Sequence, residues 1–249
     1  MLLDRILLAF SRPVGSEDYA DGVDEWEERP LDWLLTAFPD LGQVVKGKLV
    51  VDFGCGSGHQ ASAIAREFDC RVYGLDTNER TLSRAKDQYG STGVRFYTEP
   101  PEHIVGNCDV VISQNSMEHF PDPEGILEEM KRLLKPGGVL LITFGCPWFS
   151  PYGSHMHFFC KLPWVNLIFP ERTVMRVRSL YRNDGAMRYE DVESGLNKMS
   201  VAKFERIIGR SGMRMTHCRY TGVKGYDFLT RIPVVRELFV NRIDCVLVK

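Results

Sequence analysis

The stretch Val51–Gly58, VDFGCGSG, decides the fold that this sequence predicts. Its first three residues end a short, mostly apolar run, Leu49–Phe53, which is typical of a buried parallel strand. Gly54, Gly56 and Gly58 then stand at alternate positions, and glycine tolerates the backbone angles of a tight turn that a Cβ disfavours. Glycine also lets a ligand lie directly against the main chain. We therefore predict a strand that ends in a ligand-binding turn and continues into a helix.

Apolar runs and amphipathic segments alternate along most of the chain. Strands are predicted at Leu49–Phe53, Arg71–Leu75, Val94–Tyr97, Asp109–Ser113, Val139–Phe144, Met213–Tyr220 and Ile243–Val248. Helices are predicted after Pro30, over Gln60–Phe68 and Asn78–Tyr89, after the N-cap residue Asp122, and between Ser200 and Gly212. This alternation predicts an α/β fold with a doubly wound, mostly parallel seven-stranded sheet.

The composition along the chain suggests four segments. Residues 1–46 are expected to form a helical cap, and residues 47–145 the cofactor-binding core. Residues 146–199 break the alternation with many aromatic residues and prolines, so we expect a lid inserted after the fifth strand to bind the acceptor molecule. Residues 200–249 supply a helix and two strands that complete the sheet.

Charge and cysteine content limit the class of protein. The 249 residues include 31 Lys and Arg and 33 Asp and Glu, for a net charge of -2, which argues against a dedicated nucleic-acid binder. Seven scattered cysteines, an odd number, indicate free thiols and a cytoplasmic protein. The acid-rich run at 16–29 contrasts with the base-rich run at 161–190. The sequence gives no oligomeric state.

The first ten residues place their apolar side chains on one face of a short helix. These side chains are Leu2, Leu3, Ile6, Leu7 and Phe10. A helix packed on the body of the protein is the simpler interpretation. The alternative is a weak contact with the inner face of a membrane.

Two aspartates stand where strands end beside the glycine turn. Asp52 precedes the turn, and Asp76 ends the next strand. Ligands of open parallel sheets bind outside the carboxyl ends of the strands, where an acid can accept both hydroxyl protons of a ribose. A nicotinamide dinucleotide is an alternative, because Gly56-x-Gly58-x-x-Ala61 fits its loose fingerprint. However, Asp52 suits a cationic amino-acid group better than a pyrophosphate.

Four blocks of sequence carry a resemblance to a known family. They are VDFGCGSG at 51–58, GLD at 74–76, DVVISQNSMEHF at 109–120 and LLKPGGVLLI at 133–142. In this order they resemble the signature blocks of class I S-adenosylmethionine-dependent methyltransferases, most of all the small-molecule branch called the type 11 methyltransferase domain. The resemblance runs from about Lys48 to Phe144. It implies a Rossmann-like methyltransferase fold and S-adenosyl-L-methionine as the cofactor.

The resemblance also implies the cofactor contacts. The methionine part would lie against Asp52, Gly54, the backbone of Cys55 and Gly56, and Gly58 would also belong to the cofactor site. Asp76 would hold the ribose, with Thr77 beside the adenine and Gln114 near the sulfonium. Members usually place an Asp after the third strand to bind the adenine amino group, but here a proline of Tyr97–His103 occupies that position. We expect either that Glu99 or Glu102 takes its place or that backbone groups alone hold the adenine.

Three histidines are candidates for a general base, which methyl transfer needs only if the acceptor must lose a proton. His119 belongs to the Glu-His pair that the family commonly has, although it can equally order its loop by a hydrogen bond. His155 and His157 follow the fifth strand, and in an extended stretch both would face the same way. Surface or structural roles for them remain open.

Two further hypotheses concern ligands of the lid. Cys146, His155, His157 and Cys160 have the ligand types of a zinc site in an unfamiliar spacing, so we expect no metal. Arginines in the stretch 171–182 suit a phosphate or carboxylate on the acceptor, such as a phosphate-bearing glycan or lipid, or simply form a solvated helix face paired with the acidic N-terminal segment.

The sequence thus predicts an enzyme that transfers a methyl group from S-adenosylmethionine to a small or carrier-linked acceptor, most readily at oxygen. One alternative is an NAD(P)-dependent oxidoreductase. Another is a non-catalytic, S-adenosylmethionine-binding subunit of a larger assembly.

Overall fold

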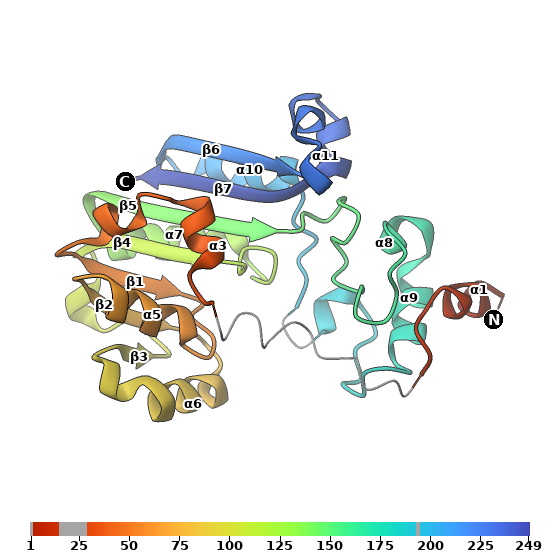
Figure 1. Cartoon of the computed structure of the whole chain (residues 1–249), viewed down its shortest axis with the longest axis horizontal. Coiled ribbons are helices and arrows are strands. Elements are labelled where there is room, and N and C mark those ends of the chain that lie inside the picture. The colour runs from red at the N-terminus through yellow and green to blue at the C-terminus, as the bar shows by residue number, and fades with distance from the viewer. Residues whose placement is uncertain (1, 15–28, 193–194) are drawn as a thin grey trace.

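A computed structural model describes residues 2–14, 29–192 and 195–249. Its centre is a seven-stranded sheet in the order β3-β2-β1-β4-β5-β7-β6 (Figure 1). The strands are β1 Leu49–Phe53, β2 Arg71–Leu75, β3 Arg95–Tyr97, β4 Cys108–Gln114, β5 Leu134–Gly145, β6 Arg214–Gly222 and β7 Val240–Val248. Strands β1 to β5 pair in parallel, and β7 runs antiparallel to both β5 and β6. The predicted doubly wound, mostly parallel sheet is therefore confirmed.

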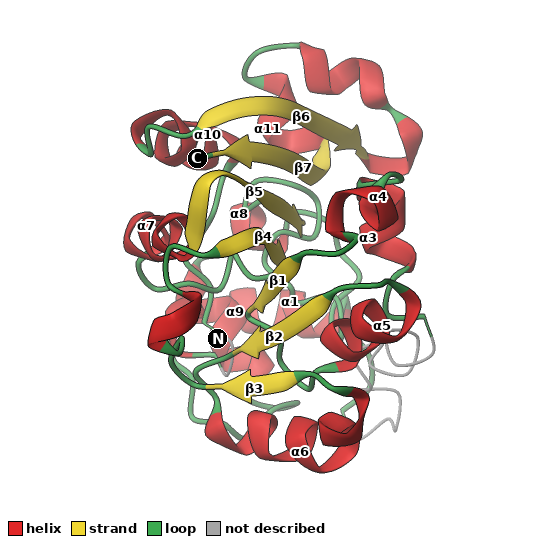
Figure 2. Cartoon of the chain, turned by 90° about the vertical axis from the view of Figure 1, so that its left-hand side faces the viewer, coloured by secondary structure: helices red, strands yellow, loops and turns green. Residues whose placement is uncertain are grey.

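Helices cover both faces of the sheet (Figure 2). Those that cover it are α3 Asp32–Ala37, α4 Leu41–Val45, α5 His59–Glu67, α6 Glu79–Tyr89, α7 Pro123–Leu133 and α10 Val201–Arg210. Helices α3, α4 and α5 bury their apolar residues with Val50, Val110 and Ile112 on one face. Helices α7 and α10 pack on the other face, against Val51 and Val111. Alternate residues of each strand thus enter two separate cores, as expected for a sheet covered on both sides.

Local capping signals fix the helix boundaries as the sequence predicts. Asp122 accepts a hydrogen bond from the backbone N–H of Gly125 at 3.0 Å, directly before Pro123. Ser200 accepts one from the backbone N–H of Lys203 at 3.1 Å. Gly212 follows the end of α10 with φ of +68°, the left-handed conformation that terminates helices. These short-range interactions depend on few residues, which explains why the sequence alone reveals them.

The segment after β5 lies beside the sheet and has its own apolar core. It contains α8 Val165–Ile168 and α9 Glu171–Arg178, which form a third cluster with residues such as Phe159 and Tyr189. Helix α1, Leu2–Ala9, joins this cluster through Leu7 and lies next to α9, far from the sheet (Figure 1). The first 46 residues are therefore divided, because α1 packs on the lid segment whereas α3 and α4 pack on the sheet.

Residues 223–239 form an element that the sequence analysis did not anticipate. Two 3-10 turns, Val223–Gly225 and Asp227–Arg231, and helix α11, Val235–Phe239, connect β6 to β7. Their apolar side chains are largely exposed, so this short segment lacks the buried stripe by which longer helices are predicted. In the described part of the chain, no helix has the length and apolar character needed to cross a membrane.

The close packing of β2 against the glycine turn generates the first prediction. A Cβ built on Gly74 would lie 2.6 Å from the ring of Phe96 and 2.9 Å from the Sγ of Cys55. We expect Gly74→Ala to lower the free energy of unfolding by about 1–3 kcal/mol, because a buried ring must move. Gly90→Ala is the matched control, since a Cβ there meets no atom within 4 Å and its φ is -57°. Urea unfolding measures both, and equal stabilities would contradict the packing argument.

Candidate active site

The glycine turn is fixed by backbone hydrogen bonds to β2. The N–H groups of Gly54 and Cys55 both donate to the carbonyl oxygen of Leu75, at 2.8 and 3.0 Å. Gly54 and Gly56 have φ values of +79° and +50°, which side-chain-bearing residues rarely adopt. A Cβ on Gly54 would lie 2.7 Å from the Oγ of Ser116, whereas one on Gly56 would meet open space. The turn is therefore rigid, and its main chain is open on the side of Gly56.

Asp76 links the turn to the start of α6. Its Oδ2 accepts the N–H of Gly56 at 2.8 Å, and its Oδ1 accepts the N–H of Asn78 at 2.9 Å. The carboxylate is half-buried, so it keeps an accessible side at the carboxyl end of β2. Thr77 follows it and is exposed. This geometry places Asp76 where a second pair of donors, such as vicinal hydroxyls, can approach it.

Asp52 is a buried carboxyl group with an unfilled position. It is 1% exposed, and its Oδ1 accepts a hydrogen bond from the side-chain amide of Gln60 at 2.7 Å. Its Oδ2 is buried and has no hydrogen-bond partner. Burial raises the pKa of Asp52 to about 7, and the nearby charge of Asp76 adds to the increase. A cation placed beside the carboxyl group would supply the missing partner.

Other polar groups without partners follow β4. The buried Oε1 of Gln114 and Oδ1 of Asn115 have no hydrogen-bond partner. Asn115 has φ of +50°, and its N–H donates to the carbonyl oxygen of Thr143 at 2.7 Å. Because β1 and β4 are neighbours, these groups lie at the same sheet edge as Asp52. Glu102, in contrast, begins a 3-10 turn and is exposed.

The loop after β4 is tied to the lid segment. The side-chain amide of Asn197 donates to the carbonyl oxygens of Met117 and Phe120, at 2.7 and 2.8 Å. The N–H of Asn197 donates to the carbonyl oxygen of Glu118 at 2.9 Å. One asparagine thus holds three residues of the loop, and the sequence analysis missed it because the two segments are about 80 residues apart.

The structure brings two of the three candidate histidines together. The rings of His119 and His155 have centroids 5.4 Å apart in an edge-to-face arrangement, and the Nδ1 of His119 lies 2.7 Å from the carbonyl oxygen of Gly195. Burial lowers the pKa of His155 to about 4, with smaller contributions from His119 and His157. The expectation of an extended stretch here was wrong: residues 151–159 form successive turns, so His157 is exposed instead of sharing the orientation of His155.

Glu118 is a second buried acid, which the sequence analysis mentioned only as part of the Glu-His pair. It is 3% exposed, and neither of its carboxyl oxygens has a hydrogen-bond partner. Burial raises the pKa of Glu118 to about 8, so at neutral pH the group is mostly a protonated acid. Its charge also contributes to the raised pKa of Cys146, which shows that the two groups are near each other. The first residue after β5 therefore borders the loop after β4.

An ionic cluster around the buried Asp244 joins β5, β6 and β7 close to the same edge. Asp244 is completely buried and accepts hydrogen bonds from Thr143 at 2.7 Å and from two nitrogens of Arg219 at 2.8 and 3.0 Å. Arg242 lies 3.0 Å from Asp244 and stacks over the ring of Trp33 from α3. Two arginines thus face one aspartate, leaving a positive excess.

Three of the four arginines at 171–182, which were candidates for binding a phosphate, have intramolecular partners. Arg178 is buried and makes two hydrogen bonds to Asp184, at 2.6 and 2.7 Å. Arg176 pairs with Asp4 at 2.8 Å, and the guanidinium of Arg182 lies over the ring of Phe158. The acidic segment that was expected to pair with them, at 16–29, lies almost entirely outside the described residues. These contacts favour a structural role for these three arginines.

The zinc hypothesis is not supported by the positions of its cysteines. The thiol of Cys160 is directed at the carbonyl oxygen of Phe10, and that of Cys146 at the side chain of Asn241. Over residues 2–14, 29–192 and 195–249, no three His, Cys, Asp or Glu side chains converge as metal ligands.

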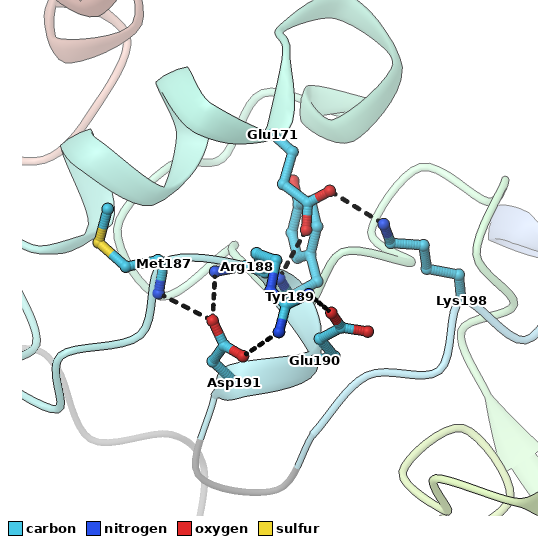
Figure 3. A network of polar contacts seen from close by, with 7 residues as sticks. All are labelled: Glu171, Met187, Arg188, Tyr189, Glu190, Asp191 and Lys198. Carbon is cyan, nitrogen blue, oxygen red and sulfur yellow. Dashed lines mark hydrogen bonds and ion pairs between the residues drawn. The ribbon is translucent and has the colours of Figure 1, made fainter.

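A network of polar contacts closes the base of the lid (Figure 3). Glu171, the first residue of α9, accepts hydrogen bonds from the N–H of Tyr189 at 2.7 Å and from the ammonium group of Lys198 at 2.9 Å. The ammonium group also lies 5.6 Å from the ring centroid of Trp148. The start of the lid, α9 and the segment that leads to α10 are thereby joined, so the loops near the histidines share one support.

Comparisons with known proteins agree with this fold. Residues 51–142 match the methyltransferase domain family, over the glycine turn, Asp76 and the loop after β4. A methyltransferase of Mycobacterium leprae is 26% identical over 218 residues, which cover 86% of this chain and 76% of that protein. The fold and these matches define a Rossmann-like methyltransferase. The chain therefore contains a class I S-adenosylmethionine-dependent methyltransferase domain, which the family match places at residues 51–142.

Two further similarities concern proteins with more specific names. A ubiquinone biosynthesis O-methyltransferase of Erwinia tasmaniensis is 35% identical over 119 residues, 45% of this chain and 47% of that protein. The solved structure of a geranyl diphosphate methyltransferase in complex with S-adenosylmethionine superposes with a TM-score of 0.60 at 15% identity, over 98% of this chain and 94% of that one. The second likeness concerns the fold alone. Together the matches decide against the nicotinamide alternative.

The residues of the turn fit the cofactor of this family. The unpartnered Oδ2 of Asp52 suits an ammonium group, and the open main chain at Gly56 admits a ligand that a Cβ would obstruct. Asp76 has an accessible side for ribose hydroxyls. We assign the same roles to these three residues that the resemblance implied, now as a proposal based on burial and hydrogen bonding.

The raised pKa of Asp52 predicts how binding depends on pH. A ligand ammonium group binds the carboxylate, so the affinity for S-adenosylhomocysteine should fall by up to about tenfold per pH unit below pH 7. Asp52→Asn should bind more weakly and lose this dependence. Calorimetry from pH 5.5 to 8.5 measures both proteins, and a wild-type affinity that is constant over this range would contradict the assignment.

The same raised pKa has the opposite consequence for the ligand-free protein. The folded state holds the Asp52 proton more tightly than the unfolded chain does. The contribution of this proton to the free energy of unfolding is therefore complete near pH 4 and is lost as the pH rises towards 7. Asp52→Asn should therefore stabilise the ligand-free protein at pH 8 by about 1–3 kcal/mol while weakening binding. A loss of both stability and affinity would instead indicate a general packing defect.

Asp76→Ala tests the ribose contact. We expect the affinity for S-adenosylhomocysteine to fall by about 1–3 kcal/mol, because hydroxyl partners and the hydrogen bond to Gly56 are lost together. Asp87→Ala removes an exposed acid of α6 and serves as the control. If both variants bind like wild type in calorimetry, Asp76 does not hold the ribose.

Proposed function

We propose that the protein methylates an oxygen atom of a small or carrier-linked anionic acceptor, with His119 as the general base. Bound S-adenosylmethionine would supply an activated methyl group on a sulfonium, so positioning the acceptor in line accounts for most of the catalysis. The observation that carries the proposal is the convergence of the glycine turn, the loop after β4 and the lid at one sheet edge.

The hydrogen bond of His119 supports its role as the base. The Nδ1 can only donate to the carbonyl oxygen of Gly195, so in the neutral ring the Nε2 lacks a proton and can accept one. His155 packs against this ring, and its lowered pKa keeps it neutral, so it adds no competing positive charge. His157 is exposed and is not part of this pair.

The anionic character of the acceptor is inferred from the ionic cluster of β5 and β7. Arg242 belongs to a group with two guanidinium charges and one carboxylate, near the end of β5 where the lid begins. A carboxylate or phosphate on the acceptor would balance the excess charge. Residue Trp33 of α3 holds the Arg242 guanidinium in place, so this element would form one wall of the acceptor site.

Transfer of a labelled methyl group from S-adenosylmethionine to compounds in metabolite extracts tests the proposal. We expect His119→Ala to lower turnover by about 10²–10⁴-fold while its affinity for S-adenosylhomocysteine stays within about twofold of wild type. His157→Ala is the matched control and should keep its activity. Turnover of His119→Ala equal to wild type would show that this histidine only orders the loop.

The same assay distinguishes the alternatives. A labelled product with an anionic group supports the acceptor class, whereas labelled neutral products contradict it. Binding of S-adenosylhomocysteine without any labelled product from wild-type protein would favour the non-catalytic subunit.

A further inference from the structure

Strands β6 and β7 bring together two cysteines that the sequence separates by the whole connection between these strands. Cys218 and Cys245 are register partners in the antiparallel pair, and the register is continuous from His217 to Thr221. Both side chains pack in the apolar cluster on the α7 and α10 face of the sheet, so they point to the same side. Among the strand pairs that the structure describes, no other two cysteines stand opposite each other.

The spacing of these two residues suits a disulfide. Directly opposed residues of antiparallel strands have Cα atoms about 4.5–5.5 Å apart, and disulfides join Cα atoms about 4.4–6.8 Å apart. Both cysteines are free thiols in the structure. The thiols are in contact, because a hydrogen bond between them is the main cause that lowers the pKa of Cys218 and raises that of Cys245. A bond between the two sulfur atoms can therefore form without a change of register.

The two thiols differ in access and in acidity. Strand β6 is the last strand of the sheet (Figure 1), and Cys218 on it is half-buried. Cys245 lies on β7 between β5 and β6 and is completely buried. The lowered pKa gives Cys218 more of the reactive thiolate, whereas the raised pKa keeps Cys245 protonated. An oxidant from solvent therefore meets Cys218 first, and Cys245 is the thiol next to it.

We propose that Cys218 and Cys245 form a redox site, in which a hydroperoxide converts the two thiols into a disulfide. The Cys218 thiolate attacks one peroxide oxygen and becomes a sulfenic acid, while the other oxygen takes up a proton and leaves as water or an alcohol. The sulfur of Cys245 then displaces the hydroxyl group, which leaves as water with the thiol proton. In total the two thiols lose two electrons and two protons, and the peroxide is reduced. The inference does not depend on the identity of the methyl acceptor.

Peptide mapping of the full chain after treatment with hydrogen peroxide tests the proposal, with the remaining thiols blocked by N-ethylmaleimide before unfolding. We expect the peptides that contain Cys218 and Cys245 to be joined, with a mass about 2 Da below their sum, and dithiothreitol should separate them. Cys218→Ser and Cys245→Ala should each abolish the joined peptide. In Cys245→Ala the sulfenic acid has no thiol to react with, so dimedone should label Cys218 much more strongly than in the wild type.

A matched variant makes the outcome specific to this pair. Cys70→Ser removes another half-buried thiol, which is directed at the carbonyl oxygen of Ile64, and should form the joined peptide like the wild type. All variants should keep their affinity for S-adenosylhomocysteine, which shows that they are folded. Absence of the joined peptide from the wild type, or a link from Cys218 to a different cysteine, would overturn the proposal. Equal dimedone labelling of Cys218 in wild type and Cys245→Ala would also contradict it, because the buried thiol would then not react.

Discussion

The hydrogen bond between the Asp76 carboxylate and the Gly56 N–H is the contact on which the geometry of the site depends. It joins the end of β2 to the middle of the glycine turn, and the carbonyl oxygen of Leu75 fixes the start of the same turn. Because three consecutive N–H groups are occupied in this way, the turn cannot move without breaking the pairing of β1 and β2. Gly58 and Gly74 then allow Phe96 to pack beneath the turn, where a Cβ on either glycine would lie under 3 Å from the ring.

Beside this rigid turn, the site contains buried carboxyl groups that lack hydrogen-bond partners. Asp52 and Glu118 both have raised pKa values because they are removed from water, and both keep oxygens without donors. Such groups lower the stability of the ligand-free fold and strengthen the attraction for a donor or a cation that enters. The apolar cores on both faces of the sheet offset this loss. We therefore expect a bound ligand to stabilise the site, because it supplies the partners that these carboxyl groups lack in the ligand-free protein.

The sequence predicted those features that depend on neighbouring residues. The strands, the caps at Asp122 and Ser200, and the turn with its two aspartates follow from local patterns. The cluster of Arg219, Arg242 and Asp244 could not be predicted, because it depends on the antiparallel register of β6 and β7 and on the position of α3. The predicted orientation of His157 was wrong for a related reason. Alternate residues face the same way only where the backbone is extended, and residues 151–159 form turns.

The lid is bonded both to the loop after β4 and to α1. Its return segment holds the loop after β4 through Asn197 and Gly195, and its helix α9 holds α1 through the Arg176–Asp4 pair. Glu171 and Lys198 brace the segments between these two attachments. A displacement of the lid would therefore move His119 and α1 together.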